Sequence, residues 1–195
     1  MGWSPRQTYW KFGGKMGDTF RPIMGTLGYV FSPSQKEILL IHRNTRPGDS
    51  HLGKYNGLGG KVERNEDVVS GMCREIFEES GLICKQMSLA GTISWPGFGK
   101  EGEDWFGFIF RIFEVEGSLL TASKEGTLEW VAVEKVLSLP LWEGDRFFLP
   151  LVLDLNSATF HGVLPYRDGC PVSWDCSYGG PSLVFAAPER KKGSS

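Results

Sequence analysis

The stretch GGKVERNEDVVSGMCREIFEESGL, which covers residues 59–82, decides the fold of this chain. At about 3.6 residues per turn, its second half forms a helix over 66–80. Val68, Met72 and Ile76 then share one apolar stripe on that helix. The stretch therefore predicts a loop that leads into a helix with one buried face.

The helix carries signals at both ends, since Asn65 can act as the N-cap and Gly81 stands where a C′ glycine ends a helix. A second helix is expected over 145–155, with Pro150 as a kink or a start. Helices mixed with several strands predict a single domain of the α/β or α+β class. Runs of β-branched and aromatic residues predict strands at 26–31, 37–43, 88–95, 105–115, 127–133, 159–165 and 171–174.

Three glutamates lie beside the apolar stripe. Glu75, Glu78 and Glu79 fall within roughly a 100° sector of the helix. Like charges within one turn repel, a carboxylate near a buried face is costly, and the C-terminal end of a helix disfavours anions. A hard divalent cation would offset all three penalties, and a ligand set of oxygens favours Mg²⁺ or Mn²⁺ over zinc. The alternative is a solvated acidic face with Arg74 and Lys85 as partners.

Glycines precede this helix at positions 57, 59 and 60, where a loop must bring its backbone close to another group. Lys61 adds a positive charge there. A phosphate-cradling P-loop needs its lysine immediately before the helix, which is not the spacing here. The loop fits better with a phosphate that is bridged by a metal ion, with the loop carbonyls facing the metal.

At this point the residues resemble a known family. Gly60, then Glu66 after five intervening residues, then REIFEESGL at 74–82 match the Nudix box at every fixed position. The resemblance implies a Nudix α/β/α sandwich of the α/β class with a mixed β-sheet. It also implies an enzyme that hydrolyses a nucleoside diphosphate linked to another group. Carried over residue by residue, it implies Mg²⁺ held by Glu75, Glu78, Glu79 and the carbonyl of Gly59, with Arg74 orienting a ligand carboxylate and Glu66 supporting the box.

The likeness extends over about 24–165 to the MutT-like branch that hydrolyses oxidised purine nucleotides such as 8-oxo-dGTP. It is carried by KYNGLGGK at 54–61 and by LWEGDRFFLPL at 141–151. In that branch an Asn before the box and acidic residues after a Trp read the purine edge. The matching residues are Asn56, Trp142 and Asp145, and Trp95 falls where an aromatic residue lines the base pocket, although core packing is an equal alternative for it.

The chain departs from that branch after the tryptophan. The branch has two adjacent aspartates after a Trp-Pro pair, whereas here Glu143 replaces the proline and Gly144-Asp145 replace the aspartates. One carboxylate that would read the base is therefore missing or displaced.

Further residues are implied for catalysis and for the phosphates. Glu125 lies five residues before Trp130, where related enzymes place a late metal-ligating or base glutamate; the alternative is a turn residue. Glu125 or Glu79 would take a proton from the attacking water. The candidate catalytic residues are thus Arg74, Glu78, Glu79 and Glu125, and the candidate substrate-binding residues are Arg43, Asn56, Gly60, Lys61, Trp95, Trp142 and Asp145.

The predicted activity is Mg²⁺-dependent hydrolysis of a purine dNTP, oxidised or not, to the monophosphate and pyrophosphate. Removal of pyrophosphate from RNA 5′ ends and hydrolysis of dinucleoside polyphosphates are the alternatives within the family. A nonhydrolytic nucleotide sensor is disfavoured because every box glutamate is present. The isopentenyl diphosphate isomerase reaction is disfavoured because Cys73 lies inside the helix, near the apolar stripe.

The length and the net charge of the chain limit the classes of protein to which it can belong. The chain has 195 residues and a net charge of −2, which excludes a large multidomain protein and disfavours nonspecific binding of nucleic acid. We expect an arm at 1–21, a hydrolase domain at 22–175 and a tail at 176–195. Without a signal-peptide pattern or a CxxC pair, the four cysteines are expected to be reduced and the protein cytoplasmic, with a small nucleotide as ligand and no membrane contact. The oligomeric state is left open.

Overall fold

The computed structural model describes residues 19–45 and 52–179. Most of the predicted arm at 1–21 therefore lies outside the described residues, as does the tail beyond Gly179. The described elements form one mixed sheet of eight strands in the order β10-β7-β4-β5-β1-β2-β3, with β6 paired to β2. The strands are β1 (Ile23–Phe31), β2 (Glu37–His42), β3 (Tyr55–Asn56), β4 (Ile83–Trp95), β5 (Trp105–Glu116), β6 (Thr127–Ala132), β7 (Thr159–Val163) and β10 (Asp175–Gly179).

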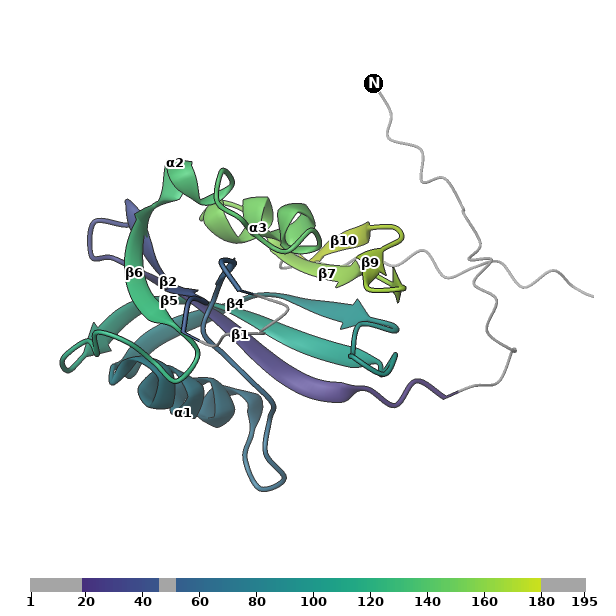
Figure 1. Cartoon of the computed structure of the whole chain (residues 1–195), viewed down its shortest axis with the longest axis horizontal. Coiled ribbons are helices and arrows are strands. Elements are labelled where there is room, and N and C mark those ends of the chain that lie inside the picture. The colour runs from purple at the N-terminus through teal and green to yellow at the C-terminus, as the bar shows by residue number, and fades with distance from the viewer. Residues whose placement is uncertain (1–18, 46–51, 180–195) are drawn as a thin grey trace, which may run out of the picture.

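Helices cover both faces of this sheet (Figure 1). Helix α1 (Val68–Ser80) lies on one face, and α3 (Asp145–Leu153) lies on the other, preceded by the short α2 (Val133–Val136). A small hairpin of β8 (Tyr166–Arg167) and β9 (Cys170–Pro171) stands apart from the main sheet. Two pairs, β1 with β5 and β4 with β7, are parallel, and the remaining pairs are antiparallel. The predicted α/β/α sandwich with a mixed sheet is therefore confirmed.

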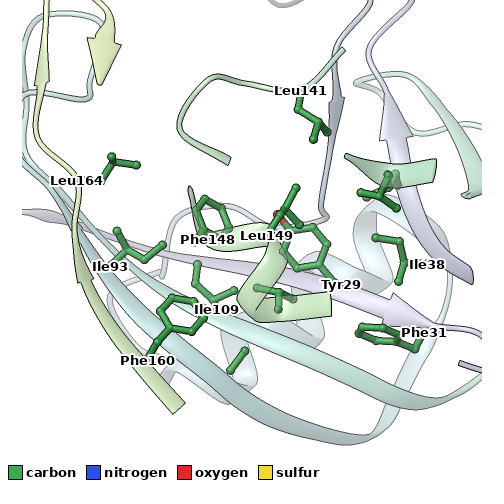
Figure 2. Close-up of a cluster of buried hydrophobic side chains, with 14 residues drawn as sticks. Tyr29, Phe31, Ile38, Ile93, Ile109, Leu141, Phe148, Leu149, Phe160 and Leu164 are labelled. Atoms are coloured by element: carbon green, nitrogen blue, oxygen red, sulfur yellow. The ribbon is translucent and has the colours of Figure 1, made fainter. Parts of the chain in front are cut away.

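The alternation of side chains along the strands fills two cores. In β2, Ile38 and Leu40 pack toward α3, while Leu39 and Ile41 pack toward α1. Successive side chains of a strand point to opposite faces, so an unbroken apolar run is what a strand covered on both sides requires. Figure 2 shows the core on the α3 side, where aromatic rings and aliphatic side chains from both layers meet. Its labelled members are Tyr29, Phe31, Ile38, Ile93, Ile109, Leu141, Phe148, Leu149, Phe160 and Leu164.

Helix α1 buries the predicted stripe. Met72 and Ile76 are fully buried, and Val68 packs against the same cluster. The predicted C-terminal stop is confirmed, since Gly81 has a left-handed φ of 75° and donates to the carbonyl of Phe77. The predicted N-cap was wrong. Asp67 caps the helix instead, accepting from the backbone N–H groups of two residues in the first turn, and it begins the helix two residues beyond Asn65.

A buried arginine ties α3 to the sheet. Arg111 of β5 donates to the carbonyl oxygens of Leu151 at 2.7 Å, Val152 at 2.8 Å and Asp154 at 3.1 Å. These carbonyls lie at the C-terminal end of α3, where carbonyl oxygens have no hydrogen-bond donor within the helix. Burial lowers the pKa of Arg111. Because α3 begins at Asp145, this contact helps to fix the position of that residue.

The C-terminal end of the sheet differs from the prediction. The expected strand over 171–174 is replaced by β9 and by β10, which pairs with β7 from Asp175 opposite Val163 to Gly179 opposite Thr159. The sheet thus reaches Gly179, inside the segment predicted as a tail, because β10 supplies hydrogen-bond partners to the edge of β7. All four cysteines are free. Among the described helices, none is long and apolar enough to cross a membrane.

Candidate active site

Arg74 organises the acidic residues around α1. Its guanidinium donates twice to Glu66, from Nε to Oε2 at 3.0 Å and from Nη2 to Oε1 at 2.7 Å. It also donates to Glu75 Oε1 at 2.9 Å and lies 3.4 Å from Glu78 Oε2. The hydrogen bonds from Arg74 are the main cause that lowers the pKa of Glu66. Lys85, which the sequence also offers as a partner for the helix glutamates, pairs instead with Glu116 at 2.7 Å.

The loop before α1 packs directly on Glu75. A Cβ placed on Gly60 would lie 2.4 Å from Glu75 Oε1, so a side chain there would displace this carboxylate. The loop is held against β1, because the carbonyl of Gly60 accepts from the N–H of Thr26 at 2.8 Å. Burial raises the pKa of Glu75, and the contact with Arg74 acts in the opposite direction.

Glu79 lies behind the same loop. Its Oε2 accepts from the backbone N–H of Gly59 at 2.8 Å. The pKa of Glu79 is raised to about 8, mainly by burial and also by the negative charges of Glu125 and Glu75, against the Gly59 N–H and Arg43, which lower it. The three predicted ligands thus have different surroundings: Glu75 and Glu79 face the loop, and the Glu78 side chain is 57% exposed.

The acidic cluster has the composition, but not the arrangement, of a metal centre. Among the described residues, no group of three or more His, Cys, Asp or Glu side chains is arranged to hold a metal ion. Two of the carboxylates are engaged with Arg74 and the Gly59 N–H, which are the positive groups nearest to them. The donor set consists of oxygens, and burial raises the pKa of Glu75 and Glu79. The residues therefore suit a hard divalent cation, provided that Glu79 turns away from Gly59.

A cavity of about 260 Å³ adjoins this loop. Its wall is built by the loop, by the ends of β4 and β5, and by the start of α3. Eight of the predicted site residues meet there, whereas the side chains of Glu75, Glu78, Glu79 and Lys61 do not line it. The lining residues are Gly25, Thr26, Leu27, Arg43, Asn56, Gly59, Gly60, Trp95, Phe98, Trp105, Gly107, Glu125, Trp142, Asp145 and Tyr166.

Asp145 is a half-buried acidic residue of the cavity wall. Its Oδ2 is buried and has no hydrogen-bond partner among the described residues. Burial raises its pKa to about 7, and Lys54 and Arg146 act in the opposite direction. Lys54 contacts the segment that precedes α3. Its Nζ donates to the carbonyl of Leu141 at 3.2 Å and lies 5.6 Å from the ring centroid of Trp142. An unpartnered carboxyl beside an indole can recognise a planar polar group.

Glu125 and Arg43 form an ion pair at the cavity. Both side chains line it, and Glu125 stands in the bend that precedes β6. Lys61 is adjacent rather than lining, because its Nζ lies 5.5 Å from the ring centroid of Trp105. Arg43 and Glu125 lie near α1, since both act on the pKa of Glu79, whereas Lys61 lies beside the aromatic side chains of the cavity.

A half-buried network beside the cavity helps to fix Asn56 and Arg43. Glu129 of β6 accepts from the Tyr55 hydroxyl at 2.8 Å and lies 3.0 Å from Nδ1 of His42. The rings of His42 and Tyr55 stack with centroids 4.3 Å apart. Hydrogen bonds from Tyr55 and His42 help to lower the pKa of Glu129, against burial, which raises it. His42 precedes Arg43 and Tyr55 precedes Asn56, so the network holds two site residues through their chain neighbours.

The prediction missed seven lining residues: Gly25, Thr26, Leu27, Phe98, Trp105, Gly107 and Tyr166. A signal existed for Trp105, because an antiparallel pairing of the two strands at 88–95 and 105–115 places it opposite Trp95, as observed. Phe98 lies on the connection between these strands, 5.0 Å from the ring of Tyr166. Trp95 lines the cavity and also packs edge-on against Phe148 of the core.

Comparison with known proteins decides the family. The family model described as the NUDIX domain matches residues 22–152. The chain belongs to the Nudix family. It is a Nudix hydrolase. The segment that resembles the Nudix box, residues 60–82, forms the loop that begins at Gly60 and helix α1.

Individual relatives agree with this assignment. The oxidized purine nucleoside triphosphate hydrolase of Mus musculus is 35% identical over 116 residues, which are 60% of this chain and 72% of that protein. A Nudix hydrolase of Bacillus subtilis is 30% identical over 134 residues, which are 67% of this chain and 79% of that protein. The crystal structure of a MutT protein from Bacillus halodurans superposes with a TM-score of 0.68 at 29% identity, covering 79% of this chain and 97% of that one.

Proposed function

We propose that this Nudix hydrolase converts a purine deoxynucleoside triphosphate, with 8-oxo-dGTP or dGTP as the leading candidates, to the monophosphate and pyrophosphate. The observation that carries the proposal is the cavity, whose lining combines polar and aromatic groups (Asn56, Trp142 and Asp145) with an ion pair (Arg43 and Glu125). A base and a polyphosphate require these two kinds of contact. The name of the mouse relative supports the same substrate class.

We assign the base to the polar and aromatic groups that include Asp145. Asn56 and Asp145 would hydrogen-bond the purine edge, and Trp142 and Trp95 would stack on the base or wall it in. We assign the phosphates to Arg43 and Lys61, which would neutralise part of their charge. This division follows from the chemistry of the side chains, because Arg43 is a cation of the cavity lining, whereas Asn56 and Asp145 are groups that can hydrogen-bond the edge of a base.

We assign Mg²⁺ to the box, held by Glu75, Glu78, Glu79 and the carbonyl of Gly59. When bound, such a cation supplies charge neutralisation and a lower pKa for water. Glu125, which lines the cavity, or Glu79, which lies behind the loop, would take a proton from the attacking water. Arg74 would keep Glu75 in position. A role in sanitising the nucleotide pool goes with the cytoplasmic location that we expect.

A substrate panel tests the proposal. The enzyme would be incubated with Mg²⁺ and 8-oxo-dGTP, dGTP, 5′-triphosphorylated RNA or a dinucleoside polyphosphate, and the products separated by ion exchange. We expect the highest kcat/KM for one of the two purine dNTPs, with monophosphate and pyrophosphate as products. A higher kcat/KM for the RNA or for the dinucleoside polyphosphate would replace this function by one of the two family alternatives. Tight binding without turnover of any substrate would indicate a sensor.

A further inference from the structure

The hydroxyl of Tyr166 occupies the space beside Asp145 where another residue would place a side chain. A Cβ built on Gly144 would lie 2.0 Å from the Tyr166 hydroxyl oxygen. Gly144 has φ −65° and ψ −32°, a conformation that alanine adopts freely. The backbone therefore does not require glycine at this position, and the main obstacle to a side chain there is the tyrosine.

Tyr166 is held in this place from two directions. Its backbone N–H donates to the carbonyl of Pro96 at 2.7 Å, which ties β8 to the end of β4. Its ring meets the ring of Phe98 edge-on, with centroids 5.0 Å apart. The side chain lines the same cavity as Asn56 and Asp145. A phenol with a fixed ring has a hydroxyl in a defined position, as recognition of a ligand requires.

The surroundings of Tyr166 keep its hydroxyl uncharged. Burial is the main cause that raises its pKa, and the negative charges of Asp145 and Glu143 add to the effect. A neutral phenol can donate its proton, whereas an ionised carboxylate can only accept. Since Asp145 Oδ2 has no partner among the described residues, the cavity presents a donor and an unpaired acceptor side by side.

We propose that Tyr166 is a specificity-determining residue that donates a hydrogen bond to the 6-oxo group of a purine while Asp145 accepts from the adjacent N1–H. This pair of groups matches the edge of guanine, where an acceptor at position 6 stands next to a donor at N1. Adenine presents the reverse, a donor at position 6 and an acceptor at N1. The inference rests on the proposed function for the identity of the base, but it can be tested by binding alone.

Binding of dGMP and dAMP, measured by calorimetry at pH 8 without divalent metal, separates base recognition from hydrolysis. We expect the wild type to bind dGMP more tightly than dAMP. Tyr166→Phe, which removes one hydroxyl, should weaken dGMP binding roughly three- to tenfold and change dAMP binding less than twofold. Tyr29→Phe is the matched control, because this second buried phenol also lies near Asp145 but does not line the cavity. It should leave both affinities within twofold.

Gly144→Ala gives an independent test that leaves the tyrosine in place. The added methyl group should displace the hydroxyl and so reproduce the loss of dGMP binding. In the double variant with Tyr166→Phe the two losses should not add, since both act on the same hydrogen bond. Equal loss of dGMP and dAMP binding, no loss in Tyr166→Phe, or the same selective loss in Tyr29→Phe would overturn the inference. So would a wild type that binds neither nucleotide. Absence of triphosphate hydrolysis with these affinities intact would overturn only the proposed function.

Discussion

At the residue scale, Asp145 shows how a binding group can oppose the stability of the fold. The carboxyl is buried with one oxygen unpaired, and its pKa rises from its ordinary value of 3.8 to about 7. A folded-state pKa above the unfolded one means that the folded protein binds the proton more tightly. The stabilising effect of the protonated form is complete below about pH 4, and it is lost as the pH rises through about 7.

Asp145→Asn should therefore stabilise the protein in a pH-dependent way. At pH 4 the variant and the wild type should unfold alike, because a protonated carboxyl and an amide are both uncharged. At pH 8 the variant should be more stable, by at most about 4 kcal/mol, since each pKa unit corresponds to ~1.4 kcal/mol. Urea unfolding at the two pH values measures this difference. Equal gains at both would show that the buried charge is not the cause. The same variant should lose purine binding.

Residues of the box could be predicted from the sequence because their roles depend on local spacing. Glu75 and Glu79 are one helical turn apart, and Gly60 meets Glu75 through a short loop, so a single segment brings them together. Tyr166 carries no such signal. It reaches Gly144 only because β8 stands beside the start of α3, and the sequence alone shows an aspartate missing there without showing what fills the space.

At the element scale, the capping of α1 shows where local signals mislead. Asn65 and Asp67 are both good N-cap residues, and the apolar pattern fits either start. Asp67 is the N-cap, because its Oδ1 accepts from the N–H groups of Val69 and Ser70 at 2.8 and 3.0 Å. Hydrogen bonds from Ser70 are the main cause that lowers the pKa of Asp67. The residues between Gly60 and the cap are thus left to the loop, where Glu66 can meet Arg74.

Replacing this cap should loosen the helix that carries the box. Asp67→Ala should lower the melting temperature by about 2–4 °C at pH 7, the range expected for one cap in a domain of this size. Asn65→Ala, the matched change at the position first predicted, should leave the melting temperature unchanged. Differential scanning calorimetry distinguishes the two. A larger loss from Asn65→Ala would mean that the helix starts earlier than observed.

At the scale of the whole molecule, the site lies where the two layers of the sandwich meet. The box comes from the α1 layer, Asp145 from the α3 layer, and the sheet between them supplies Asn56, Trp95 and Trp105. The class of fold could be predicted because unbroken apolar strands and two helices leave few alternatives. The strand order could not, because the pairing of β10 with β7 depends on contacts distant in sequence.

The end of the sheet provides a test of where the folded unit stops. A chain that ends after Trp174 should melt at a lower temperature than the full chain, because it lacks β10 and leaves the edge of β7 unpaired. A chain that ends after Gly179 keeps every strand of the sheet and should melt like the full chain. If both truncated chains melt alike, β10 contributes nothing to stability.

The central claim is that the carboxylates behind the Gly60 loop act on a purine triphosphate in the adjoining cavity. The initial rate of pyrophosphate release from 8-oxo-dGTP in saturating Mg²⁺ tests it most directly, with Glu79→Gln against the wild type. Glutamine keeps the size of the side chain and an acceptor for the Gly59 N–H, but it loses the charge and the proton-accepting group. We predict a rate at least ~100-fold lower, with no change in the matched control Glu134→Gln, an exposed residue of α2. A Glu79→Gln enzyme within twofold of the wild type, or a wild type that releases no pyrophosphate, would contradict the account.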